Sequence, residues 1–160
     1  MLMLYEISEA GTAKIPAAWN NQQIADALAA IKEHYRQDGY KRPWVSYLAA
    51  DKGEVAGTCG FKAEPRDGKV EFFYSPFPQK SGSAIDMVRK LVEITEFHDK
   101  FSLRVIRTAP QETPQNAFLK EVGFTPVPIE DKGVKLWEWR IEYRGGQRSR
   151  AINANVGPRI

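Results

Sequence analysis

One segment of this 160-residue chain combines groups that could hold an anion. Residues 76–84 read PFPQKSGSA and lie between a β-rich stretch and an amphipathic one. The first turn of a helix presents unpaired N–H groups with a partial positive charge, and glycine lets a ligand approach the backbone closely. Lys80 and two serine hydroxyls add hydrogen-bond donors. The segment therefore predicts an anion-binding turn, with an ordinary capped turn as the alternative.

The stretch after this turn has the spacing of an amphipathic helix. Its apolar side chains recur mostly at intervals of three and four residues, which places them on one helix face. Ser83 followed by Asp86 fits a capping box at the start of such a helix. The residues of the apolar face are Ala84, Met87, Val88, Leu91, Val92 and Thr95.

The stretch before the turn predicts a meander of three antiparallel strands over residues 44–49, 54–61 and 70–74. These runs are rich in β-forming residues, and turn signals at 51–53 and 67–68 separate them. Two glycines inside the middle strand indicate a bulge or a close approach of two backbones. Before the meander, apolar residues spaced as on a helix face run from Ile24 to Tyr35.

The remaining elements complete a sheet with helices on it. A short strand is predicted near residues 3–7, and another at 103–107. Thr113 as N-cap and Gly123 past the end bracket a short helix, and two strands over 124–127 and 134–141 follow. The fold class is therefore α/β (α+β), with a mixed, mostly antiparallel sheet of about six or seven strands flanked by helices.

These features together resemble the GNAT family of N-acetyltransferases. In that family a strand leads through Gln/Arg-x-x-Gly-x-Gly/Ala into a helix that binds the pyrophosphate of coenzyme A, and residues 79–84 read QKSGSA here. The resemblance runs from about Trp44 to Trp139 and is nearest to the branch acting on protein N-termini and small amines. It implies a GNAT-like sheet, acetyl-CoA as co-substrate, and backbone N–H groups around Phe73 to Phe77 at the thioester. The residues implied at the coenzyme are Phe73, Phe77, Gln79, Lys80, Ser81, Gly82, Ser83 and Ala84.

The function implied is transfer of an acetyl group from acetyl-CoA to a primary amine, by direct attack of the amine on the thioester. The acceptor would be a small molecule or a protein N-terminus. Glu71 is the candidate general base, directly or through a water, and Tyr74 is a candidate acid. The alternatives are a salt-bridged structural glutamate and a tyrosine that only packs.

Two departures from the family pattern keep another function open. The tyrosine that some relatives use as general acid falls on Leu119, which cannot donate a proton. Glu112 or Thr113 takes the place of an asparagine found near the start of the second helix in many relatives, and Asn116 is shifted. A catalytically silent member of the fold that binds CoA or another ligand is the first alternative.

Other residues with reactive side chains have ordinary interpretations. His34 and His98 have no partner cluster and are read as surface histidines, and Cys59 as a buried small hydrophobe. No metal is predicted, since a single cysteine excludes a multi-cysteine zinc site. Trp44 near Arg42 could line an acceptor pocket.

Composition bounds the rest. The chain is 42% hydrophobic and 27% charged, as expected for one globular domain. We expect an acetyltransferase-like domain over residues 1–143 and a basic, flexible tail over 144–160. A net charge of +3 is too small to indicate nucleic acid, although a ribosome- or nucleic-acid-associated module using the tail is a second alternative. The sequence shows no signal or membrane segment and contains one cysteine, which favours a cytoplasmic protein. A homodimer is a further expectation.

Overall fold

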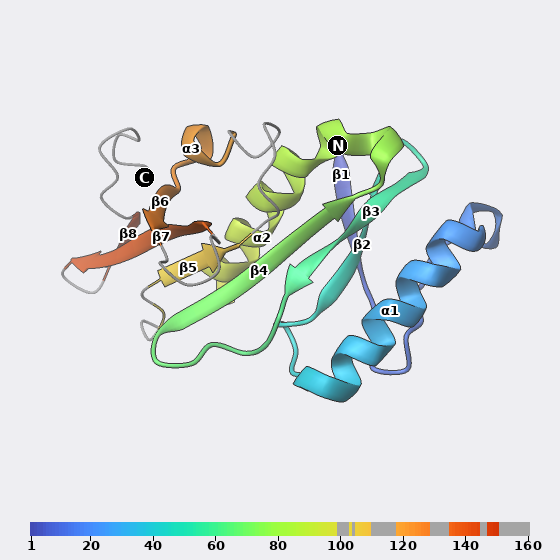
Figure 1. Cartoon of the computed structure of the whole chain (residues 1–160), viewed down its shortest axis with the longest axis horizontal. Coiled ribbons are helices and arrows are strands. Elements are labelled where there is room, and N and C mark those ends of the chain that lie inside the picture. Colours follow the sequence, from blue (N-terminus) through green and yellow to red (C-terminus); the bar gives the residue numbers. More distant parts are fainter. Residues whose placement is uncertain (99–102, 104, 110–117, 129–134, 145–146, 151–160) are drawn as a thin grey trace.

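The computed structural model describes residues 1–98, 103, 105–109, 118–128, 135–144 and 147–150. Strands and helices follow one another in an order close to the predicted one (Figure 1). They are β1 (Leu2–Glu6), η1 (Ala17–Trp19), α1 (Gln22–Asp38), β2 (Ser46–Asp51), β3 (Glu54–Phe61), β4 (Lys69–Pro76), η2 (Pro78–Ser83), α2 (Ala84–His98), β5 (Val105–Thr108), α3 (Phe118–Val122), β6 (Thr125–Pro128), β7 (Lys135–Arg144) and β8 (Gln147–Arg150).

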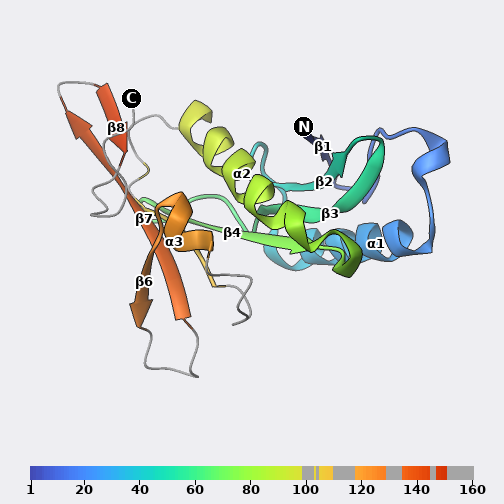
Figure 2. The ribbon, with the colours of Figure 1, turned by 90° about the horizontal axis from the view of Figure 1, so that it is seen from above.

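All the strands belong to one sheet. Its order is β1-β2-β3-β4-β5-β7-β6, and β8 pairs with β7 off this path. Every neighbouring pair is antiparallel except β4 and β5, which are parallel. The predicted mixed, mostly antiparallel sheet flanked by helices is confirmed. α1 and α2 lie on opposite faces of it (Figure 2).

Local hydrogen bonds fix both ends of α1. The side chain of Asn21 accepts a hydrogen bond from the N–H of Ile24 at 2.9 Å, which caps the N-terminus. Gly39 takes a φ of 94° and its N–H donates to the Tyr35 carbonyl, which ends the helix. The predicted apolar face is buried against the sheet through Ile24, Ile31 and Tyr35.

The glycines of β3 allow close contacts with both neighbouring strands. A Cβ on Gly57, whose φ is +149°, would stand 2.3 Å from the Ser75 carbonyl oxygen of β4. A Cβ on Gly60 would stand 2.5 Å from the Val45 carbonyl oxygen. The register of β2 and β3 also shifts between Ala49 and Ala50, as a bulge does. Both features predicted from the glycines are therefore confirmed.

The start of α2 differs from the prediction. Ser83 is the last residue of η2, which runs directly into α2, so the turn is helical where a free N-cap was expected. The predicted apolar face is confirmed, since Ala84, Met87, Val88, Leu91, Val92 and Thr95 are all buried. Among the described helices, none is long and apolar enough to cross a membrane.

The C-terminal part contains more strand than predicted. β7 extends to Arg144, and β8 pairs back onto it through residues 147–150. The tail predicted from residue 144 thus includes a strand in its first part, because these residues find a partner in β7. Residues 151–160 lie outside the described residues, as does the predicted N-cap Thr113. Gly123, with a φ of 123°, ends α3 as predicted.

Candidate functional site

β4 has different neighbours on its two edges. On one edge it pairs with β3, and this pairing continues past the strand, because the N–H of Phe77 donates to the Ala56 carbonyl at 2.7 Å. On the other edge the parallel pairing with β5 ends where Glu71 meets Arg107. From Phe72 onward β4 has no strand partner on this edge within the described chain, and Figure 1 shows it extending past β5.

The backbone groups of β4 divide between these edges by alternation. The N–H of Phe77 and the carbonyl of Glu71 both bond to the β3 side, so the odd-numbered residues direct their backbone groups there. The even-numbered residues face the β5 side, as the Phe72 carbonyl does when it accepts from the Thr108 hydroxyl at 2.9 Å. The N–H of Phe77 is thus already bonded to β3, and by alternation the N–H of Phe73 is directed to the same edge. Tyr74 is the residue between them whose N–H is directed toward the β5 side.

One face of β4 at this point is filled with aromatic side chains. The Tyr74 ring contacts Phe118 of α3 edge-on, with centroids 5.7 Å apart. Phe72 meets Phe124 in the same way at 5.5 Å. Burial raises the pKa of the Tyr74 phenol, so this hydroxyl is protonated near neutral pH. Tyr74 therefore packs against Phe118, as expected for a structural tyrosine, and its protonated hydroxyl also suits the alternative role of an acid.

The opposite face of β4 is charged. Glu71 Oε2 lies 2.8 Å from Lys62 Nζ, with 28% of the glutamate side chain exposed. Phe73, its neighbour on this face, lies with its ring centroid 6.4 Å from that of His34. The ion pair is the contact expected for a structural glutamate, and a base at this position would have to give up Lys62.

The turn between β4 and α2 contacts elements that the sequence did not connect to it. The Gln79 side-chain amide donates to Gln23 Oε1 of α1 at 2.8 Å. Lys80 Nζ pairs with Glu54 Oε2 at 2.7 Å. A pocket of about 270 Å³ opens between these residues, η1 and the β2–β3 turn, and its lining includes Trp19. Pairing between residues so distant in the chain leaves no signal in one sequence.

The rest of the turn leaves room for a ligand. Ser81 and Gly82 are exposed, and a Cβ added to Gly82 would meet nothing within 4 Å. Ser83 is half-buried and Ala84 is buried at the start of the 15-residue α2. An anion placed here would lie at the positive end of that helix.

The positions that depart from the family pattern are only partly described. Leu119 is fully buried in the core, on the α3 turn that also carries Phe118. It supplies no acid, as expected. Glu112, Thr113 and Asn116 lie outside the described residues.

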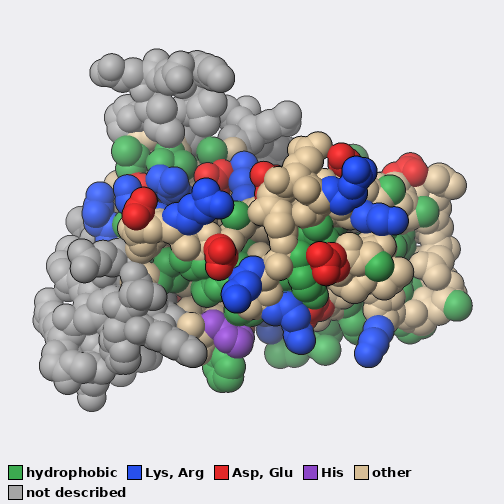
Figure 3. Space-filling view, turned by 90° about the horizontal axis from the view of Figure 1, so that it is seen from below, with side chains coloured by type: hydrophobic (Ala, Val, Ile, Leu, Met, Phe, Trp, Pro, Cys, Tyr) green, Lys and Arg blue, Asp and Glu red, His purple; other side chains and the backbone are tan. Residues whose placement is uncertain are grey.

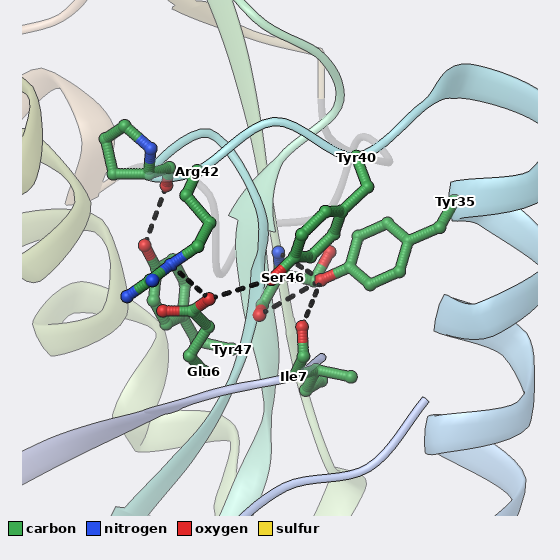
Figure 4. A network of polar contacts seen from close by, with 8 residues as sticks. Glu6, Ile7, Tyr35, Tyr40, Arg42, Ser46 and Tyr47 are labelled. Atoms are coloured by element: carbon green, nitrogen blue, oxygen red, sulfur yellow. Dashed lines mark hydrogen bonds and ion pairs between the residues drawn. The ribbon is translucent and has the colours of Figure 1, made fainter. Parts of the chain in front are cut away.

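Arg42 and Trp44, the residues predicted to line an acceptor pocket, lie in the loop between α1 and β2. Arg42 Nε pairs with Glu6 Oε1 of β1 at 2.8 Å, and the Tyr40 hydroxyl donates to the same oxygen (Figure 4). Trp44 packs edge-on against Phe61 of β3, with ring centroids 5.1 Å apart. Arg42 also lines a separate pocket of about 420 Å³ beside β1.

Tyr35 accounts for the tight join between α1 and the first strands. Its hydroxyl donates to the Ile7 carbonyl at 2.8 Å and accepts from the Ser46 N–H at 2.9 Å (Figure 4). Burial raises the pKa of this phenol. All these partners are buried backbone groups, so the tyrosine holds structure together.

The remaining reactive side chains show no cluster. Cys59 is buried, and burial raises the pKa of its thiol, as its interpretation as a core residue requires. His34 pairs with Asp38 at 2.9 Å, and His98 lies exposed at the end of α2. Within the described ranges, no three His, Cys, Asp or Glu side chains are grouped as metal ligands would be. On the face shown in Figure 3, basic side chains are interspersed with acidic ones, without a continuous basic patch.

The fold was compared with those of known proteins. No protein-family model matches the sequence, and no curated protein matches it either. Solved structures do match. The N-acetyltransferase PseH of Campylobacter jejuni, in complex with acetyl coenzyme A, is 12% identical, with a TM-score of 0.58 over 88% of this chain and 99% of that one.

Two further structures agree. An acetyltransferase from Salmonella typhimurium, which modifies the N-terminal serine of ribosomal protein L7/L12, is 16% identical, with a TM-score of 0.57 over 88% of this chain and 95% of that one. A GNAT-family acetyltransferase of Streptococcus pneumoniae is 17% identical, with a TM-score of 0.56 over 88% and 100%. The strand that loses its parallel partner and turns into a helix therefore belongs to a chain with the fold of the GNAT acetyltransferases.

Proposed function

We propose that this protein is an acetyl-CoA-dependent N-acetyltransferase that acts on a primary amine. The observation that supports this most directly is the open edge of β4 followed by the turn into α2. An extended ligand would lie along this edge beyond the end of the β4–β5 ladder, and the turn would present the positive end of a helix to its phosphates. The three similar structures are all acetyltransferases, and one of them is a complex with acetyl-CoA.

The turn residues would hold the pyrophosphate. Exposed Ser81 and Gly82 leave the backbone accessible, and Gln79 and Ser83 can add donors. Lys80 is the one cation of this turn, and it would exchange Glu54 for a phosphate. That exchange is physically reasonable because the Glu54 side chain is 67% exposed and its surface pair is worth little. Ala84 keeps the helix start small.

The transfer step needs a base and an acid. The amine nitrogen forms a bond to the thioester carbon as the carbon–sulfur bond breaks, so the amine loses a proton and the sulfur gains one. Glu71, directly or through a water, would take the first proton once it leaves Lys62. The Tyr74 phenol, protonated near neutral pH, would supply the second.

Calorimetric titration tests the binding half of the proposal. We expect acetyl-CoA and CoA to bind with micromolar Kd, and Gly82→Trp to weaken both at least tenfold. The backbone of Gly82 is outside the left-handed region, so the substitution fills space without straining the chain. Glu93→Trp, on the exposed side of α2, is the matched control and should leave binding unchanged. Absence of binding to the wild type would refute the proposal.

The catalytic half separates an enzyme from a silent binding protein. We expect Glu71→Gln to keep its acetyl-CoA affinity and to lose at least about 100-fold in kcat, as removal of a general base does. Lys62→Gln serves as the comparison, because it breaks the same ion pair without removing the carboxylate. Equal losses in the two variants would mean that the ion pair matters and that Glu71 is not the base.

A further inference from the structure

A row of charged residues crosses the sheet at the point where β4 and β5 separate. Glu71 of β4 is in register with Arg107 of β5, and Arg107 is in register with Glu138 of β7. Residues opposite one another on neighbouring strands present their side chains on the same face. The row therefore lies on the face of the sheet opposite Phe72 and Tyr74.

Both glutamates of this row lie close to cations other than Arg107. Glu71 pairs with Lys62 at 2.8 Å. Glu138, whose side chain is 10% exposed, lies 3.7 Å from Arg140. Arg107 between them is half-buried, and its Nε is buried without a hydrogen-bond partner. Within the described part of the chain, no ion pair to its guanidinium is found either.

An arginine in this state is expected to have a partner of another kind. Removing a guanidinium from water without replacing its hydrogen bonds is costly. Its planar fork matches a carboxylate, which it can hold through two parallel N–H···O bonds. The unsatisfied Nε thus indicates an anionic group that approaches from outside the described chain.

The position of Arg107 connects this anion to the reaction. Arg107 stands at the last paired position of the β4–β5 ladder, beside the open edge. Aromatic side chains fill the other face at this level, so a polar amine has to approach across the charged face. Neighbouring strands are about 4.8 Å apart. One small molecule can therefore reach Arg107 and Glu71 together.

We propose that the acceptor is an amine that also carries a carboxylate, of the α-amino acid class, and that Arg107 binds that carboxylate. This rests on the proposed function. An α-amino acid carries both groups on one carbon, so a carboxylate on Arg107 directs the amino group toward β4. Glu71 lies on that side, where the proposed base is needed.

Acetylation rates of matched acceptors test the assignment. The wild type is assayed with the twenty α-amino acids and with their α-amides, which keep the amine and lose the charge. We expect the best acid to exceed its amide by at least 100-fold in kcat/KM, mostly through KM. Arg107→Gln should lower kcat/KM for the acid to the value for its amide. Arg140→Gln, on the same strand face as Glu138, should keep the preference for the acid over the amide. Amides acetylated as well as acids would overturn the proposal.

Two measurements do not depend on turnover. Millimolar amino acid should raise the Tm of the wild type but not of Arg107→Gln, and the amides should have no effect. This result would stand even if calorimetry shows no acetyl-CoA binding and so refutes the proposed function. If no amino acid is acetylated and none raises the Tm, the proposal fails.

The second measurement asks whether Arg107 already has a partner. Without acceptor, Arg107→Met should unfold at the wild-type Tm or above, because it removes an unsatisfied cation. A Tm lower by several degrees would show that another part of the chain neutralises Arg107, and would overturn the assignment.

Discussion

The two edges of β4 differ in how far their backbone hydrogen-bond pairing extends along the strand. Toward β3 the pairing is continuous, and Gly57 brings the strands closer than any side chain would permit. Toward β5 the ladder stops after Glu71, and the Thr108 hydroxyl donates a hydrogen bond to the Phe72 carbonyl. The pairing with β3 fixes β4 in place from Phe72 to Pro76, the part that has lost its pairing with β5.

The difference shows how two neighbouring strands of one sheet can be paired over only part of their length, as β4 and β5 are. A strand without a partner on one side loses hydrogen bonds and invites wrong pairing. Here the β3 edge, the aromatic packing of Phe72 and Tyr74, and the helices on both faces supply the stability that the open edge lacks. We therefore expect mutations on the closed edge to affect stability and those on the open edge to affect binding as well.

Breaking the closed edge should have the largest effect. In Gly57→Ala the new Cβ would meet the Ser75 oxygen at 2.3 Å and would sit at a φ of +149°. We expect a loss of about 3 kcal/mol or more in the free energy of unfolding, from overpacking and backbone strain together. Urea unfolding measures it. Gly53→Ala, also at positive φ but with open space, should lose only about 1 kcal/mol. Equal losses would show that the close approach is unimportant.

Loosening the open edge should have a smaller effect on stability. Thr108→Val keeps the shape of a buried side chain and removes the hydroxyl that bonds the Phe72 carbonyl at 2.9 Å. We expect a loss of about 1–2 kcal/mol and a weaker acetyl-CoA affinity, measured by urea unfolding and calorimetry.

Thr95→Val is the control for this change. Its hydroxyl also bonds a carbonyl at 2.9 Å, but that carbonyl, of Leu91, lies within a helix where the backbone already supplies a donor. We expect a smaller loss of stability and no change in affinity. If Thr108→Val leaves the acetyl-CoA affinity unchanged, Thr108 does not contribute to the binding site.

The smallest effect concerns pH. Cys59 lies opposite Tyr74 on the closed edge, and burial raises the pKa of its thiol above the unfolded value. The folded form then keeps the proton that the unfolded form releases, so stability is full below about pH 8.5 and decreases above it, by at most about 1.4 kcal/mol per pH unit.

Urea unfolding from pH 7 to 9.5 measures this slope, and Cys59→Ala should reduce it. The folded protein should also react with a thiol reagent only as fast as it unfolds. Rapid labelling of the native protein would show that the closed edge opens.

Much of the fold follows from local chemistry. The helix from Ile24 to Tyr35 and the turn at Asp67 and Gly68 were predictable because each depends on residues near in sequence. The close approach at Gly57 was predictable because a glycine inside a β-rich run marks it, although its contacts are with Ser75 of the next strand. The position of the turn over residues 79–84, directly before α2, was also predictable, since a glycine before an amphipathic helix is a local pattern; its role in binding a ligand stays a prediction. The helical form of that turn was not, because η2 and α2 join through contacts with the sheet.

The sequence by itself determined most of the helices and strands and the turn into α2, and it named candidate residues for chemistry there. Only the tertiary structure decided which of them act together. It turned the N–H groups of Phe73 and Phe77 toward β3, paired Glu71 with Lys62, and joined Lys80 to Glu54. It also placed Arg107 between two occupied glutamates. The physical reason is that strand register and edge partners arise from pairing between distant segments, which no local pattern of side chains specifies.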